Sequence, residues 1–152
     1  MARWIASLLI GCVIIVGALL VYRTYALNEP VVKLDDLSLK IEFATTPAAR
    51  EKGLSGRESI PEDSGMLLVF PKSERYGIWM KDMLVPIDIF WLDDKGQVIS
   101  IASDVAASSF PNVFYPALPT HYVLETAAGF ARMYGVATGT LFSLKNLPNV
   151  SQ

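Results

Sequence analysis

An uncharged run of 19 residues near the N-terminus, from Trp4 to Tyr22, divides this chain of 152 residues into two parts. As an α-helix the run would be roughly 28 Å long, close to the bilayer hydrocarbon thickness of about 30 Å. Arg3 and Arg23 flank the run, and its two terminal aromatic residues stand where a membrane interface favours them. The run predicts one N-terminal transmembrane helix that contacts the membrane through residues 4–22.

Two other interpretations of residues 1–27 compete with an uncleaved anchor. A signal peptide could be cleaved after "TYA", which ends at Ala26. A lipoprotein signal ending in "LIGC" at Cys12 is less favoured, because an apolar stretch would then follow the lipidated cysteine directly. The apolar run is also longer than the usual signal-peptide core of about 7–15 residues, which favours the anchor. The slight positive-inside bias favours an extracytoplasmic, periplasmic location for the C-terminal domain.

Charge and residue types exclude several classes of function. Arg3 and Arg23 account for two of the 13 basic residues, so the remainder carries 11 against 15 acidic residues, a formal charge of −4. No run of Lys or Arg indicates a nucleic-acid surface. The single histidine, His121, and the single cysteine cannot supply a typical zinc site, and the phosphate-binding glycine motifs are absent. We therefore expect no cofactor, no metal and no nucleic-acid partner.

Short apolar segments follow a linker over residues 28–36. Residues 37–43 alternate as a half-buried strand, and a helix over 45–53 is expected to start at Thr46 and end at Gly53. A long proline-containing loop is expected over 104–119. Further strands are expected over 66–71, 75–81, 86–93, 97–102, 121–125 and 139–144, with a short helix over 126–134. The pattern predicts a mainly β (α+β) fold, a small barrel-like domain over 37–147 with one or two short helices.

Three blocks of this domain resemble a bacterial and archaeal family, domain of unknown function 192. They read "TPAAREKGLSGRESIPEDSGMLLVFP", "WMKDMLVPIDIFWLDDKGQVISI" and "HYVLETAAGFARMYGVATG", and the resemblance runs from about Leu37 to Leu144. The sequence departs from the family pattern at two places. It has "KDM", with Asp82, where the family usually has Lys-Asn-Thr, and "GTLF", with Thr140, where a Gly-Asp pair is usual. The resemblance implies a small β-rich barrel, often exported or membrane-tethered, and it implies no established activity. Matching positions include Arg57, Gly65, Met66, Phe70, Pro71, Trp79, Met80, Lys81, Pro86, Asp88, Tyr122, Glu125 and Gly129.

Asp88 lies in the middle of the strand expected over 86–93, both faces of which are largely apolar. A carboxylate in such a place needs a partner, because its desolvation is costly. Lys81 lies on the preceding strand, two residues after Trp79. We therefore predict that Lys81 and Asp88 form an ion pair at the edge of an aromatic-lined hollow.

The charged and aromatic residues of the three blocks allow three interpretations. They could be a structural network, in which Lys81 pairs with Asp88 and Arg57 either caps loops or pairs with Glu125. They could instead line a cleft for an anionic or hydroxyl-rich ligand, with two stacking faces. Asp88 and Glu125 could also be the carboxylate pair of a hydrolase of envelope glycan, which requires a separation of about 5–9.5 Å. The candidate ligand-binding residues are Arg57, Trp79, Lys81, Asp88, Tyr122 and Glu125.

The sequence favours binding over catalysis, because a nucleophile–base set and a metal set are both missing from it. We expect a membrane-tethered binding or accessory module for an envelope ligand, which could be a glycan, a small anion or a protein. The carboxylate-pair hydrolase is the alternative. A protein partner would contact the segment "FPNVFYPALP" of the proline-containing loop.

Overall fold

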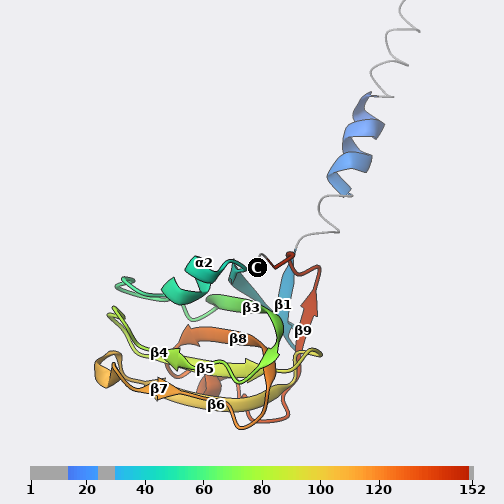
Figure 1. Ribbon diagram of the computed structural model, residues 1–152. Coiled ribbons are helices and arrows are strands. Elements are labelled where there is room, and N and C mark those ends of the chain that lie inside the picture. Colours follow the sequence, from blue (N-terminus) through green and yellow to red (C-terminus); the bar gives the residue numbers. More distant parts are fainter. Residues whose placement is uncertain (1–13, 24–29, 151–152) are drawn as a thin grey trace, which may run out of the picture. The chain divides into compact units, whose positions relative to one another are not determined.

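The computed structural model describes residues 14–23 and 30–150 of the chain, which divides into the compact units Met1–Pro30 and Val31–Gln152 (Figure 1). Residues 14–23 of the first unit form a helix with exposed side chains. Over the described ranges, no helix combines the length and apolar character needed to cross a bilayer. Much of the predicted transmembrane segment over 4–22 lies outside the described residues, as do Cys12 and the predicted cleavage site at Ala26.

The second unit is built on one curled sheet of seven strands in the order β6-β5-β8-β3-β2-β1-β9, which forms a half-barrel (Figure 1). Neighbouring strands are antiparallel except β2 and β3, which run parallel. Gln97 pairs with Leu141, so the two outermost strands approach each other at one end. The prediction of a mainly β, barrel-like domain is confirmed at this level. The strands are β1 (Val31–Leu34), β2 (Leu37–Ala44), β3 (Ser64–Glu74), β5 (Ile87–Leu92), β6 (Val98–Val105), β8 (Thr120–Ala127) and β9 (Phe142–Lys145).

Four short elements complete the unit. They are α2 (Pro47–Lys52), α3 (Phe130–Met133), the 3₁₀ turn η1 (Ala107–Ser109), and a two-stranded ribbon of β4 (Ile78–Trp79) and β7 (Val113–Phe114). Helix α2 has the predicted ends: Thr46 Oγ1 accepts a hydrogen bond from the Ala49 N–H at 3.1 Å, and Gly53 follows the last turn. The strand predicted over 75–81 shortens to the two residues of β4, and the loop predicted over 104–119 contains η1 and β7.

Among the predicted boundaries that differ from the structure, the linker and the end of β3 have a clear physical reason. Val31–Leu34 form β1 within the predicted linker, because Val32 and Leu34 are buried and the strand pairs with both β2 and β9. The strand predicted to stop at Pro71 continues to Glu74. Proline has no N–H for a sheet ladder, and Pro71 is tolerated because the pairing of β3 with β8 is irregular between Val69 and Glu74.

The sheet separates two hydrophobic clusters, because successive side chains of a strand point to opposite faces. We call the two sides the α2 face and the α3 face, after the helix that packs on each. The α2 face includes Leu54, Leu68, Met80, Ile89, Trp91 and Val123, and Ala49 of α2 packs against it. The α3 face includes Leu67, Phe90, Leu92, Leu124, Phe130 and Phe142. Each candidate site residue on β5 and β8 therefore belongs to one face only.

Candidate functional site

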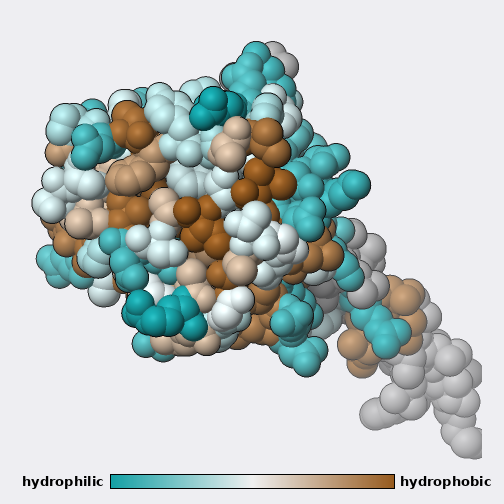
Figure 2. Space-filling view, turned by 90° about the horizontal axis from the view of Figure 1, so that it is seen from below, coloured by the Kyte–Doolittle hydropathy of each residue, from teal (hydrophilic) through white to brown (hydrophobic). Residues whose placement is uncertain are grey.

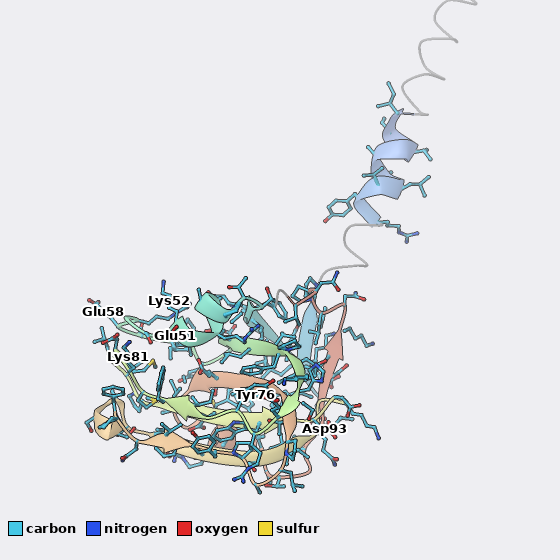
Figure 3. The ribbon with its side chains drawn as sticks, viewed as in Figure 1. Glu51, Lys52, Glu58, Tyr76, Lys81 and Asp93 are labelled. Carbon is cyan, nitrogen blue, oxygen red and sulfur yellow. The ribbon has the colours of Figure 1, made fainter. Side chains whose placement is uncertain are left out.

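A cleft of about 620 Å³ has α2 on one side, and on the other side the end of β3 and the residues that follow β3. Arg50, Glu51 and Lys52 of α2 line one side. Tyr76 and Trp79 line the other, and Figure 3 labels Glu51 and Lys52 on α2 and Tyr76 among the strands. The volume falls within the roughly 300–1,000 Å³ typical of small-molecule sites. We call this hollow the Glu125 cleft, after the carboxyl group that borders it.

Glu125 is a buried carboxyl group within an apolar surface. Its place on β8, opposite Met66 and Ile89, directs the side chain to the α2 face, where it is only 4% exposed. The N–H of Leu54 donates a hydrogen bond to the carboxyl group, while Oε2 has no partner. Burial raises the pKa of Glu125 to about 7, although the Leu54 N–H and the charge of Arg57 act in the opposite direction. Such a perturbed carboxyl group beside a cleft is typical of a functional site.

The aromatic side of the cleft contains one stacked unit and one open ring. Tyr76 stacks on Phe70 with 3.5 Å between ring centroids, and the Arg50 guanidinium lies 5.3 Å from the same Phe70 centroid. Arg50 also donates hydrogen bonds to the carbonyl oxygens of Thr45 at 2.7 Å and Val69 at 2.9 Å. These contacts hold α2 against β3. Trp79, by contrast, is 42% exposed and offers a surface for stacking.

Two of the predicted site residues, Trp79 and Glu125, line the cleft. Arg57 instead donates two hydrogen bonds to the carboxylate of Glu42, at 2.6 and 2.8 Å. This pair raises the pKa of Arg57 and lowers that of Glu42. The predicted pairing of Arg57 with Glu125 is therefore wrong, because the nearer and more exposed Glu42 takes the guanidinium.

The predicted ion pair between Lys81 and Asp88 is also wrong. Asp88 is fully buried, and its oxygens accept hydrogen bonds from the backbone N–H groups of Asp104 and Ala131, both at 2.7 Å. Its side chain points to the α3 face, where it ties β6 and the first turn of α3 to β5. Lys81 is exposed and borders a separate hollow of about 240 Å³ beside α2, where its carbonyl oxygen accepts from Ser55 Oγ at 2.8 Å.

Tyr122 also lies away from the cleft. It stands three residues before Glu125 on β8, so its side chain points to the α3 face and packs against the cluster there. Burial raises the pKa of its hydroxyl. Asp88 and Glu125 occupy neighbouring strands but project to opposite faces, so they do not flank one substrate bond as the carboxylate-pair hydrolase requires.

Sequence reasoning missed the part of the site that follows α2. Gly53 and Leu54 line the cleft, and Leu54 supplies the backbone donor to Glu125. In the sequence, the local signal for this part of the site was Gly53. It marked the end of the helix but did not indicate that the chain there lies against Glu125. In the described ranges 14–23 and 30–150, no three His, Cys, Asp or Glu side chains are grouped so that they could hold a metal ion.

Solved structures similar to this chain share its fold. A protein from Sinorhizobium meliloti 1021, described provisionally as a transcription regulator, aligns with a TM-score of 0.71 and 27% identity over 78% of this chain and 93% of its own. A protein of unknown function from Novosphingobium aromaticivorans aligns with a TM-score of 0.65 and 25% identity over 76% of this chain and 82% of its own. No curated protein is significantly similar in sequence to this chain.

A family description, DUF192 or "Uncharacterized ACR", matches residues 31–144, which include every strand except the last residue of β9. The match includes both sides of the Glu125 cleft. It also begins at Val31, where the structure places β1 and where the sequence had predicted a linker. The chain therefore belongs to the DUF192 family of uncharacterised proteins.

Proposed function

We propose that this protein is a membrane-tethered binding module whose Glu125 cleft takes up an envelope ligand. The observation that carries the proposal is the carboxyl group of Glu125, buried beside a cleft of about 620 Å³ with one oxygen unpartnered. A buried polar atom without a partner costs about 1–3 kcal/mol. A ligand group that meets Oε2 would remove this cost, so the site is suited to binding.

Binding is favoured over catalysis by the chemistry of the cleft lining. Glu125 is the one buried ionisable group that borders the cleft among the described residues, and the other two carboxylates of the lining, Glu51 and Glu74, are exposed. Ser55, the only hydroxyl-bearing serine or threonine of the lining, donates its hydrogen bond to the Lys81 carbonyl oxygen. It is therefore not paired with a general base, as a nucleophile would be.

The tether and the extracytoplasmic location rest on the sequence. The uncharged run from Trp4 to Tyr22 has the length of a bilayer span and is flanked by Arg3 and Arg23. A reporter active only in the periplasm, fused after Gln152, should be active, while a reporter active only in the cytoplasm should not. The reverse result would contradict the location. The mass of the protein in membrane fractions separates an anchor from a cleaved signal peptide.

The cleft is tested by ligand binding to the full chain in detergent micelles. A panel of muropeptides, oligosaccharides of the outer leaflet and glycerol phosphate is screened through the amide resonance of Leu54, which is present in every variant, and through the indole N–H resonance of Trp79 where that residue is kept. Trp79→Ala should weaken binding, while Phe110→Ala, which removes an aromatic side chain that is 47% exposed outside the cleft, should not. Loss in Phe110→Ala with retention in Trp79→Ala would contradict the proposal and point to the proline-containing loop.

Loss of binding in Phe110→Ala with retention in Trp79→Ala would assign a protein partner to the proline-containing loop. Phe110, Val113, Tyr115 and Leu118 are all exposed. Figure 2 shows apolar residues interspersed with hydrophilic ones on one face of the molecule. Exposed apolar residues that are interspersed in this way are normal for a soluble domain, whereas a cleft with an unpartnered buried oxygen is not.

A further inference from the structure

We propose that the ligand group recognised beside Glu125 is an uncharged hydroxyl of a sugar or polyol, which pairs with Oε2 while the carbon skeleton packs on Trp79. This inference rests on the proposed binding function and names the chemical class of the ligand. Three features of the cleft favour such a group: the hydrogen-bonding position that Glu125 leaves open, the charges that line the cleft, and the apolar surface around them.

Glu125 leaves one hydrogen-bonding position open. The Leu54 N–H donates to the carboxyl group, and Oε2 has no partner. Oε2 is a donor when the carboxyl group is protonated and an acceptor when it is ionised. A hydroxyl group can accept in the first case and donate in the second, so it satisfies Oε2 in either state.

An anionic ligand group is disfavoured because the nearby cations are already engaged. Lys72 pairs with Glu74 at 2.6 Å, and Arg57 pairs with Glu42 at 2.6 Å. Arg50 donates to two carbonyl oxygens and lies over Phe70. A carboxylate or phosphate placed at Oε2 would therefore face another carboxyl group. In the described lining, the cation still available to it is Lys52, which is exposed on α2.

A cationic ligand group is disfavoured by the surroundings of Glu125. An ammonium group would require the carboxyl group to ionise beside the aliphatic side chains of Leu54, Leu68 and Ile87, where a buried ion pair recovers little of its desolvation cost. An aromatic cage that could help is incomplete. Phe70 is covered by Tyr76 and Arg50, which leaves Trp79 as the open ring.

The walls suit the carbon skeleton of a sugar. Trp79 offers an exposed ring, and Leu54, Leu68, Met83 and Ile87 provide apolar surface on the other sides of the cleft. Sugar rings present C–H groups on their faces and hydroxyl groups at their edges. A ring that packs on Trp79 would therefore direct an edge hydroxyl toward Glu125.

The test compares three ligands that share one ring. Glucose, glucosamine and glucuronate are titrated into the full chain in detergent micelles at pH 6 and pH 8, and the amide resonance of Leu54 and the indole resonance of Trp79 are followed. At pH 6, where the amino group of glucosamine is protonated, we expect glucose to bind about tenfold or more tightly than the two charged sugars, and glucose binding should change little between pH 6 and pH 8. The other charged side chains that face the cleft or Glu125 are Arg50, Glu51, Lys52, Arg57, Lys72 and Glu74.

The variants separate a hydroxyl partner from a charged one. Glu125→Gln keeps a donor and an acceptor, so glucose binding should persist within about tenfold, whereas Glu125→Leu should weaken it beyond tenfold. Trp79→Ala should weaken it without touching the carboxyl group. Glu58→Gln is the matched control, since Glu58 is exposed and outside the cleft lining (Figure 3).

The failure of this inference differs from the failure of the proposed function. If glucosamine binds more tightly than glucose, or if glucosamine binding is lost in Glu125→Gln, the recognised group is an ammonium group and not a hydroxyl. The proposed binding function would still hold. Tighter binding of glucuronate would likewise indicate an anion. If none of the three sugars shifts Leu54 or Trp79, the sugar assignment is overturned, and the binding function is overturned only if the wider envelope panel also fails at the cleft.

Discussion

The backbone of Gly53 covers the carboxyl group of Glu125. A methyl group added to Gly53 would lie 3.0 Å from Oε2 and 3.4 Å from Oε1 of Glu125. Gly53 has a φ of 50°, a backbone conformation that side-chain-bearing residues adopt at a cost. The end of α2 is thus turned so that the next N–H, that of Leu54, reaches the carboxyl group.

The first prediction concerns this contact. We expect Gly53→Ala to lower the free energy of unfolding by about 2 kcal/mol, roughly half from the positive φ and half from crowding against Glu125. Gly56→Ala is the matched control, because Gly56 has a φ of 76° with no atom within 4 Å of the added methyl group. Urea denaturation measures both variants. Equal losses at the two positions would show that the contact with Glu125 contributes nothing.

The second prediction follows from the pKa of Glu125, raised from 4.5 to about 7 in the folded protein. The folded state binds the proton more tightly, so this stability is fully present below pH 4.5 and lost as the pH rises to about 7. The difference corresponds to about 3 kcal/mol. We expect the free energy of unfolding of the wild type, relative to Glu125→Gln, to fall by that order across this window, measured by denaturation at several pH values.

Glu42 provides a control of opposite sign for this experiment. The hydrogen bond from Arg57 lowers the pKa of Glu42 below 4.5, so the stability that it adds is present above pH 4.5 and lost on acidification. Because the pair is largely exposed, the effect of Glu42→Gln should be small. If the difference in the free energy of unfolding between the wild type and Glu125→Gln stays constant from pH 4.5 to 8, Glu125 ionises as readily in the folded protein as in the unfolded chain.

The third prediction concerns Asp88 and Lys81. Asp88→Leu should cost about 3 kcal/mol or more, because the N–H groups of Asp104 and Ala131 would both lose their acceptor in a buried place. Lys81→Met should change stability by less than about 0.5 kcal/mol, because the side chain is exposed. The double variant should equal the sum of the two single variants in thermal or urea unfolding. A double variant that loses clearly less stability than that sum would support the predicted ion pair between Lys81 and Asp88.

The fourth prediction compares two glycines that lie close to neighbouring atoms. A methyl group on Gly65 of β3 would overlap the backbone carbonyl oxygen of Glu125 on β8, which cannot move without separating the strands. A methyl group on Gly77 would lie 2.6 Å from side-chain atoms of Tyr115 and Val113, both of which are exposed, so these neighbours can give way more readily than a backbone oxygen. We expect Gly65→Ala to cost about 3 kcal/mol and Gly77→Ala about 1 kcal/mol. The reverse order in urea denaturation would contradict this account.

Elements governed by neighbouring residues could be predicted from the sequence. The start of α2 depends on Thr46 and Ala49, three residues apart. The turn after β5 depends on Asp93, whose Oδ1 accepts from the N–H groups of Lys95 at 2.9 Å and Gln97 at 2.8 Å. The period of two along β5 also depends only on neighbouring residues, and it places Asp88 on the face opposite to that of Ile87 and Ile89.

The sequence alone determined the mainly β fold class and the family, because alternation, turns and motifs are local properties. Only the tertiary structure decided which side chains meet. Asp88 is joined to Ala131, 43 residues away, rather than to Lys81, and Glu125 is covered by Gly53 from the end of α2. Alternation places a residue on one of two faces but does not say which helix packs on that face. The order of strands and the crossover through α2 settle this choice, and they depend on contacts between distant parts of the chain.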